Sequence, residues 1–221
     1  MATAGSIPYR HIVIEGGIGA GKSTLAQAIA ERLEVAPVLE PFADNPFLEQ
    51  FYSDPERYAF PVELSFLAQR YKQLKDAITA RNLFRDALVA DYVFAKSDLF
   101  ARTTLPKAEY TLFRNLFDVM AEGMPSPELI VYLRPGPERQ HAQITARGRS
   151  YEQDIDAAYL ARIEKAYEKQ FKAARGSRVL WVDTSRVDFV ANGDDLAAMV
   201  DIISQPWKVG VHQVDPVPIK P

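Results

Sequence analysis

One short segment near the N-terminus constrains the fold of this chain more than any other. Residues 16–24 read GGIGAGKST and match the pattern G-x-x-x-x-G-K-[ST]. An apolar run, HIVIE at 11–15, comes directly before the segment, and leucine and isoleucine recur at helical spacing after it. A strand, a tight glycine loop and a helix in this order predict the first unit of a parallel α/β sheet.

The same loop predicts a site for a nucleoside triphosphate, ATP, together with Mg²⁺. Glycines let backbone N–H groups turn towards phosphate oxygens, and the following helix directs its positive end at them. The Lys22 ammonium would reach the outer phosphates, and the Ser23 hydroxyl can bind Mg²⁺. The predicted nucleotide contacts are Gly16, Gly17, Ile18, Gly19, Ala20, Gly21, Lys22, Ser23 and Thr24.

Composition and charge exclude several other classes of function. The chain has 221 residues, 48% hydrophobic and 25% charged, which is ordinary for one soluble domain. Its net charge of −3 gives no electrostatic basis for binding nucleic acid, and the absence of cysteine rules out disulfides, cysteine-ligated zinc and thiol catalysis. No apolar run approaches the roughly 20 residues that span a bilayer, and the N-terminus lacks a signal-peptide core. We therefore expect a cytoplasmic protein with no nucleic-acid or membrane partner.

Strand-like and helical patterns alternate along the rest of the chain. We predict strands at 11–15, 38–40, 87–91, 129–133 and 179–182, and helices at 22–34, 57–80, 110–120, 138–146, 155–174 and 194–204. Such an alternation predicts a three-layer α/β fold of the P-loop NTPase type, a five-stranded parallel sheet with helices on both faces. The domain is predicted to span 1–204. Residues 205–221 contain four prolines and are predicted to be an extended or disordered tail.

Two carboxylates follow predicted strands, where ligands bind in open parallel sheets. Glu40 closes the second predicted strand and precedes Pro41. It fits either a general base that accepts a proton from an attacking hydroxyl, or a solvated strand-end residue. Asp91 closes the third predicted strand, and it fits either a group near Mg²⁺ or a helix-capping or surface aspartate.

A basic run lies between the helices predicted at 138–146 and 155–174. Arg147 and Arg149 flank Gly148 there. Two arginines on a glycine-jointed loop suit a lid that closes over transferring phosphates, where guanidinium groups stabilise negative charge. The alternative is a solvated basic turn. Beside a phosphate loop, the lid is the interpretation that we favour.

Taken in order, these features resemble the deoxynucleoside kinases. After the phosphate loop and Glu40 come the segment PERYAFPVELSFLAQR at 55–70, the strand-end acid Asp91, RGRSYEQDI at 147–155, and an Asp-Phe pair after the last strand. The resemblance covers roughly residues 10–204 and is most specific in the lid segment. It is closest to a bacterial branch sometimes fused to a folate-pathway pyrophosphokinase. The resemblance implies ATP-dependent phosphorylation of a deoxynucleoside.

On the acceptor side, the resemblance assigns roles to four residues. Glu40 matches the family's general base on the 5′-hydroxyl. Tyr52 and Glu152 match contacts to the sugar 3′-hydroxyl, and Arg70 matches an arginine that lines the base pocket.

On the donor side, the resemblance assigns roles to two pairs of residues. Arg147 and Arg149 match lid arginines that grip phosphates. Asp188 and Phe189 match the loop that holds the adenine of ATP, although Phe189 fits core packing equally well because its neighbours are apolar.

Three positions depart from the family pattern. The family has an arginine directly after the acid of the third strand, where this chain has Tyr92, and Lys96 is the nearest cation that would replace it. Gln143 stands where an earlier lid arginine is usual. Glu63 stands where the family reads the base with a glutamine.

The glutamate at this last position bears on which base is preferred. Glu63 lies seven residues before Arg70, so the two share one face of the predicted helix. An ionised glutamate only accepts hydrogen bonds, which favours the adjacent N1–H and N2–H donors of guanine, whereas adenine would need a protonated carboxyl. The alternative is a glutamate that turns outwards or pairs with a cation. We predict a purine preference with guanine favoured.

The leading hypothesis is ATP-dependent 5′-phosphorylation of a purine-leaning deoxynucleoside in nucleoside salvage. Two alternatives stay open: a nucleoside monophosphate kinase, and a nucleotide-binding regulator with weakened catalysis, which the missing arginine at Tyr92 would support. The resemblance also implies a homodimer. The apolar stripe at 155–174 fits either a dimer contact or a sheet-facing core, and we favour the core.

Overall fold

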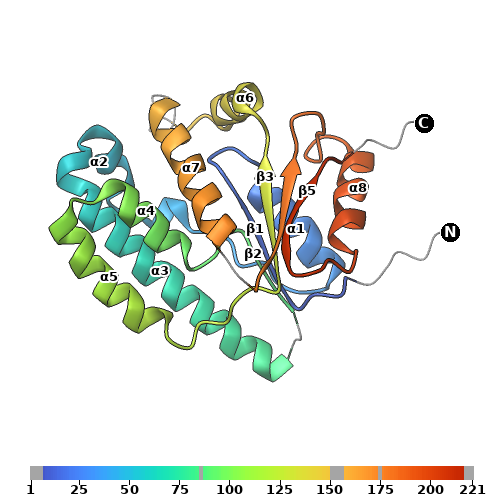
Figure 1. The fold of residues 1–221 in the computed structure, drawn as a ribbon, viewed down its shortest axis with the longest axis horizontal. Helices are drawn as coiled ribbons and strands as arrows, with labels where there is room; N and C mark the ends of the chain where they lie inside the picture. Colours follow the sequence, from blue (N-terminus) through green and yellow to red (C-terminus); the bar gives the residue numbers. More distant parts are fainter. Residues whose placement is uncertain (1–6, 85–86, 150–156, 174–175, 217–221) are drawn as a thin grey trace.

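The described residues form a five-stranded sheet in which all neighbouring strands are parallel (Figure 1). The structure is a computed structural model and describes residues 7–84, 87–149, 157–173 and 176–216. The strands are β1 (His11–Gly16), β2 (Leu88–Ala90), β3 (Leu129–Arg134), β4 (Arg178–Asp183) and β5 (Gly210–Val214). Their order is β2-β1-β3-β4-β5. The strand β1, which the phosphate loop follows, therefore lies between β2 and β3 and not at an edge of the sheet.

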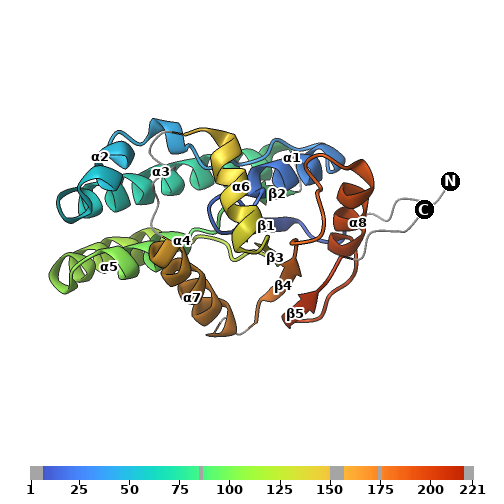
Figure 2. The ribbon, with the colours of Figure 1, turned by 90° about the horizontal axis from the view of Figure 1, so that it is seen from above.

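Helices cover both faces of the sheet, as the sequence predicts. They are α1 (Lys22–Arg32), α2 (Leu48–Ser53), α3 (Pro55–Phe84), α4 (Lys96–Thr104), α5 (Lys107–Ala121), α6 (Pro137–Arg147), α7 (Ala157–Ala173) and α8 (Gly193–Ile203), with a 3₁₀ turn, η1, at Phe42–Asp44. Figure 2 shows α3 and α5 on the side of the sheet opposite α8. No helix among the described residues is both long enough and apolar enough to cross a membrane.

The core follows from the alternation of side chains along the strands. Successive residues of a strand point to opposite faces. Ile12 and Ile14 of β1 therefore pack with residues of α1 and α8, whereas Val13 packs with residues of α3 and α5. The burial of both faces explains why β1 reads as a continuous apolar run.

Helix α7 uses its apolar stripe inside the core, which confirms the favoured interpretation. Ile163, Tyr167 and Phe171 are buried against Tyr132 of β3 and Trp181 of β4. The Tyr132 ring lies 5.2 Å from the rings of both Tyr167 and Trp181, measured between centroids. Because this stripe is buried against the sheet, it does not provide an exposed dimer contact.

Two predictions about strands need correction. Residues 38–40 do not form a strand: Val38 makes a single parallel bridge to Ala90, and the next N–H that faces β2, that of Glu40, donates to the Asp91 side chain instead of a backbone carbonyl. The segment from 205, predicted as a tail, instead contributes β5 at 210–214, which pairs with β4.

Long-range contacts hold the start of this segment in place. The Tyr9 hydroxyl donates to the carbonyl of Gln205 and accepts from the backbone N–H of Trp207, each at 2.7 Å. The Arg178 Nε donates to the Trp207 carbonyl at 2.9 Å. These partners are distant in sequence, so local composition carried no sign of the strand.

Candidate active site

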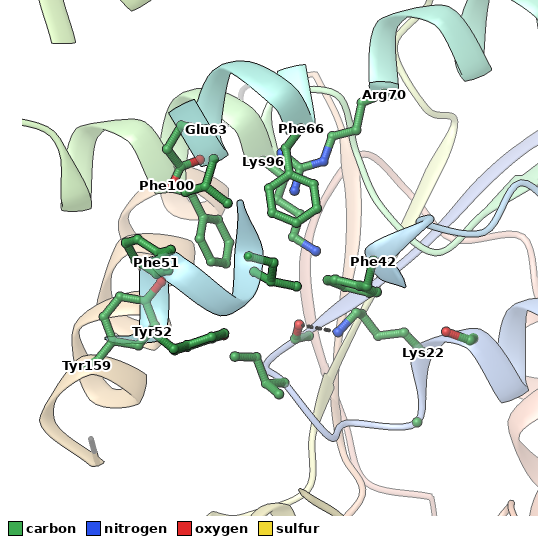
Figure 3. A pocket seen from close by; sticks show the side chains of 16 residues that line it. Lys22, Phe42, Phe51, Tyr52, Glu63, Phe66, Arg70, Lys96, Phe100 and Tyr159 are labelled. Atoms are coloured by element: carbon green, nitrogen blue, oxygen red, sulfur yellow. Dashed lines mark hydrogen bonds between the residues drawn. The ribbon is translucent and has the colours of Figure 1, made fainter. Parts of the chain in front are cut away.

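The phosphate loop lies between β1 and α1, where the sequence places it. The Lys22 ammonium is buried and donates to the carbonyls of Gly16 at 3.0 Å and Gly17 at 2.8 Å (Figure 3). Burial, reinforced by the nearby charge of Lys96, lowers the pKa of Lys22 to about 8. The ammonium thus lies over the loop, in position to meet phosphate oxygens.

Two glycines of the loop lie close to side chains of other elements. Gly21 has a φ of +81°, and a Cβ there would lie 2.8 Å from the Phe189 ring. A Cβ on Gly17 would lie 2.5 Å from the Gln140 amide nitrogen, which donates to the carbonyl of Ile18 at 2.9 Å. The absence of side chains at Gly21 and Gly17 therefore lets Phe189, from the loop after β4, and Gln140 of α6 pack closely against the phosphate loop.

The Asp188-Phe189 pair lies beside the phosphate loop. Phe189 is 3% exposed and its ring packs on Gly21, so its side chain belongs to the core in this structure. The Asp188 carboxylate pairs with Arg139 of α6 at 3.0 Å. A contact of this pair with the adenine of ATP stays a prediction.

Asp91 joins the phosphate loop to the segment that carries Glu40. Its Oδ2 accepts from the Ser23 hydroxyl at 2.5 Å, and its Oδ1 accepts from the backbone N–H of Glu40 at 2.7 Å. A hydroxyl and a carboxylate oxygen are ligands that suit Mg²⁺. Among the described residues, no group of three or more histidine, cysteine or acidic side chains is placed to hold a metal ion.

Glu40 is the most strongly paired carboxylate of the site. Its Oε1 accepts from the Arg70 Nε at 2.7 Å and from the Arg70 Nη2, and its Oε2 accepts from the Lys96 Nζ at 2.7 Å. Burial alone would raise the pKa of Glu40, but the charges and hydrogen bonds of Arg70 and Lys96 outweigh it and lower the pKa to about 2. The side chain is therefore an anion at neutral pH.

An apolar cavity extends from the phosphate loop towards α2, α3, α4 and α7. Figure 3 shows Lys22 and Phe42 on one side of it and Glu63, Phe100 and Tyr159 on the other. Tyr52, the predicted sugar contact, lines this cavity, as do Glu63, Arg70 and Lys96. Its aromatic walls come from Phe42, Phe51, Tyr52, Phe66, Phe100 and Tyr159.

Glu63 lies at the end of the cavity opposite the phosphate loop. It is 3% exposed, which contradicts an outward-turned glutamate. The Thr104 hydroxyl lies 3.0 Å from its Oε1. Burial raises the pKa of Glu63 to about 7, against the opposing charge of Arg70 and the hydrogen bond of Thr104.

Comparison with known sequences identifies the family to which this chain belongs. A family model described as deoxynucleoside kinase matches residues 12–205. The chain belongs to this family. It is therefore an enzyme, a kinase that transfers a phosphoryl group. The matched range includes the phosphate loop, the walls of the cavity and the lid segment.

Individual members of the deoxynucleoside kinase family agree with this assignment. The chain is 32% identical to the deoxyguanosine kinase of Bacillus subtilis, over 83% of this chain and 91% of that protein. It is 35% identical to the deoxyadenosine kinase of Dictyostelium discoideum, over 74% of this chain and 67% of that protein. Among solved structures, a deoxyadenosine kinase from M. mycoides with bound dATP matches with a TM-score of 0.69 at 28% identity, covering 80% of this chain and 92% of that one.

The position that lacks the family's arginine is filled by a buried ring. The Tyr92 side chain is buried and its hydroxyl donates to Gln73 at 2.6 Å. Lys96, the nearest cation that would replace this arginine, lies at the start of α4 and donates to Glu40. Arg70, predicted to line the base pocket, lines the cavity, where it bonds Glu40 and donates from Nη1 to Ser97 at 2.8 Å.

The lid is described in part. Arg147 is the last residue of α6, and Gly148 follows with a φ of +70°. The Arg149 guanidinium lies 5.3 Å from the centre of the Phe42 ring, at the edge of the cavity. Glu152 and the side chain of Arg147 lie outside the described residues, so their phosphate and sugar contacts stay predictions.

Several site residues were not predicted from the sequence. Phe66 lies on the same face of α3 as Glu63 and Arg70, and the Arg70 guanidinium lies 4.9 Å from its ring centre. Spacing of three and four residues could have identified it. Glu15 ends the apolar run of β1, and a carboxylate there was a sign of a buried polar contact.

Glu15 connects three parts of the site. Its Oε1 accepts from the Val93 N–H at 2.8 Å, and its Oε2 accepts from the Tyr167 hydroxyl at 3.0 Å and the Gly16 N–H at 3.3 Å. Burial raises its pKa, although the charges of Lys96 and Lys22 oppose the shift. The side chain ties the phosphate loop to α7 and to the loop before α4.

Proposed function

We propose that the enzyme uses ATP with Mg²⁺ to phosphorylate the 5′-hydroxyl of a purine deoxynucleoside, with guanine favoured. The observation that carries the proposal is the place of Glu40. The backbone N–H of Glu40 donates to Asp91, which accepts from Ser23 of the phosphate loop, while the buried Glu40 carboxylate contacts Arg70 and Lys96, which line the apolar cavity. An acceptor hydroxyl bound at Glu40 would therefore meet a phosphoryl group held by the loop.

The donor half of the proposal rests on the phosphate loop. Backbone N–H groups and the Lys22 ammonium would hold the phosphates of ATP. Ser23 and Asp91 would hold Mg²⁺, which neutralises charge on the phosphate oxygens when it is bound. Arg149 lies at the edge of the cavity, where a guanidinium would stabilise charge on the transferring group.

On the acceptor half, Glu40 serves first to orient the hydroxyl. With a pKa of about 2, this carboxylate is a weak base, so it accepts a hydrogen bond from the 5′-hydroxyl and takes its proton late in the transfer. Phosphoryl transfer through a loose transition state needs little activation of the nucleophile, and positioning supplies most of the catalysis. Arg70 and Lys96 hold the carboxylate in place.

The base end of the cavity supports the purine preference. Aromatic rings of Phe66 and Phe100 provide stacking and apolar contact, and Glu63 provides the polar group that would fix the base. The Bacillus subtilis relative is a deoxyguanosine kinase and the Dictyostelium discoideum relative a deoxyadenosine kinase, so both act on purine deoxynucleosides.

Product formation with ATP and a panel of deoxynucleosides, ribonucleosides and nucleoside monophosphates tests the proposal. We expect deoxyguanosine and deoxyadenosine to be phosphorylated, and the monophosphates not to be. Glu40→Gln should lower kcat by about 10²–10⁴-fold, because it removes the proton acceptor, while the KM for ATP changes little. Glu56→Gln, an exposed glutamate of α3, is the matched control and should retain full activity. Near-normal turnover by Glu40→Gln would contradict the role of Glu40.

We also propose that the enzyme is a homodimer that pairs through α5. Leu112, Leu116 and Val119 lie at steps of four and three on this helix and are 53%, 37% and 74% exposed. An exposed apolar stripe of this kind is typical of an interface between subunits. Sedimentation or light scattering should find a dimer for the native chain and a monomer for Leu112→Glu with Val119→Glu. A native chain that is monomeric at micromolar concentration would refute this proposal.

A further inference from the structure

Glu63 occupies the position from which a base would be read. It lies seven residues from Arg70 on one face of α3, a separation of about 10 Å along the helix axis, which is on the scale of a nucleoside. Arg70 bonds Glu40 at the reacting end of the cavity, and Figure 3 shows Glu63 beside Phe100 at the other end. A nucleoside with its 5′-hydroxyl at Glu40 would therefore present its base to Glu63.

The Thr104 hydroxyl can serve either protonation state of Glu63. Its oxygen lies 2.9 Å from the carbonyl of Phe100 and 3.0 Å from the Oε1 of Glu63. A threonine hydroxyl has one hydrogen, so it donates to one of these two acceptors. When Glu63 is ionised, the hydroxyl donates to its carboxylate. When Glu63 is protonated, the carboxyl can donate to Thr104, whose own hydrogen then goes to the Phe100 carbonyl.

The charges around Glu63 leave its two protonation states closely balanced. Burial opposes ionisation, and so does the negative charge of Glu40. Arg70 on α3 and Lys96 on α4 favour ionisation, and Tyr159 of α7 faces the carboxyl as a neutral phenol whose pKa is raised by burial and by Glu63 itself. With a pKa of about 7, both forms of Glu63 are present near neutral pH.

We propose that Glu63 determines base specificity through its protonation state, so that one enzyme changes its preferred purine with pH. This inference rests on the proposed function, because it concerns the acceptor of the same reaction. The ionised carboxylate accepts from N1–H and N2–H of guanine. The protonated carboxyl donates to N1 of adenine and accepts from its N6 amino group. No covalent step is involved, only the proton carried by the carboxyl.

The ratio of kcat/KM for deoxyguanosine to that for deoxyadenosine measures this preference. It should rise by about 100-fold between pH 6 and pH 8, because the ratio of ionised to protonated carboxyl changes tenfold per pH unit around its pKa. Neither purine titrates in this interval. Glu63→Gln both donates and accepts, so it should favour deoxyadenosine with a ratio that does not change with pH. Glu56→Gln, the exposed control, should reproduce the native curve.

Thr104→Val provides an independent check on the direction of the effect. Removing the hydroxyl withdraws a hydrogen bond from both forms of Glu63, but the bond to the charged carboxylate is the stronger one, so the pH at which the preference changes should move upwards. Valine retains the shape of threonine, so the helix and the cavity wall are preserved. A shift to lower pH would contradict the contact between Thr104 and the carboxylate.

Calorimetric titration tests the proton directly and does not depend on turnover. In buffers of different ionisation enthalpy, deoxyadenosine binding at pH 7.5 should take up protons and deoxyguanosine binding at pH 6.5 should release them. Both effects should vanish in Glu63→Gln. A native enzyme that phosphorylates purines at a constant ratio, with no proton exchange on binding, would overturn the role of Glu63 and leave the proposed function intact. An enzyme that neither binds nor phosphorylates a deoxynucleoside would overturn both.

Discussion

Removing the charge of Glu40 should destabilise the fold as well as slow the reaction. The carboxylate is the anionic partner of Arg70 and Lys96, whose side chains are 3% and 4% exposed. Glu40→Gln keeps the shape of the side chain but leaves two buried cations without their counter-charge. Breaking a buried ion pair from one side costs about 3–5 kcal/mol of the free energy of unfolding.

The pKa of Glu40 gives a second measure of the same quantity. It falls from an ordinary value of 4.5 to about 2 in the folded state, which corresponds to about 3 kcal/mol. Because the folded pKa is depressed, this contribution is present above pH 4.5 and is lost as the pH falls through about 2. The advantage of the native chain over Glu40→Gln should therefore be about 2 kcal/mol smaller at pH 3 than at pH 7.

Urea unfolding followed by tryptophan fluorescence measures the difference, since Trp181 is buried in the sheet. We expect Glu40→Gln to lose about 3–5 kcal/mol at pH 7. Adding Lys96→Met should recover part of the loss, because it removes one of the two unpaired cations. Glu56→Gln should change stability by less than about 0.5 kcal/mol. Equal stability of Glu40→Gln and the native chain, or a difference that does not decrease at low pH, would refute the argument.

Three further predictions concern neighbouring residues. Gly21→Ala should cost about 1–3 kcal/mol more than Gly148→Ala in urea unfolding, because both residues have positive φ but only a Cβ on Gly21 meets the Phe189 ring; equal losses would contradict the contact. Tyr92→Phe should lose about 0.5–1.5 kcal/mol through its hydroxyl bond while turnover stays close to native, and a large loss of turnover would give the hydroxyl a catalytic role. Lys96→Met should lower kcat by about 10²-fold while Lys96→Arg retains most of it, and full activity of Lys96→Met would show that Glu40 needs no second cation.

The parts of the fold that could be predicted are those with strong local patterns. The phosphate loop lies between an apolar strand and a helix, and α3 follows from apolar residues at steps of three and four. Helix α4 was not predicted because it buries Lys96 and Ser97 as well as Leu99, so its inner face is partly polar and shows no apolar stripe. The strand β5 alternates half-buried and exposed residues, and its pairing with β4 depends on contacts distant in sequence.

The candidate site divides in the same way. Lys22, Ser23 and Asp91 could be located because each is fixed by the end of a strand or the start of a helix. The cations that bind Glu40 come from α3 and α4, and which ones reach it depends on how these helices pack. From the sequence, Arg70 was predicted only as a residue of the base pocket. The burial of Glu63 likewise depends on how α3 packs against α4, which spacing on one helix does not reveal.

The strand order has a consequence for how the chain reaches this structure. Strand β2 is added beside β1, β3 on the other side of β1, then β4 beside β3 and β5 beside β4. Each strand therefore joins an open edge in the order in which the chain is synthesised, and none has to be inserted between two strands that are already paired. The phosphate loop has both neighbouring strands in place once residue 134 is made. The sheet can therefore assemble outwards from β1 in the order of translation, and residues 210–214 add the last strand beside β4.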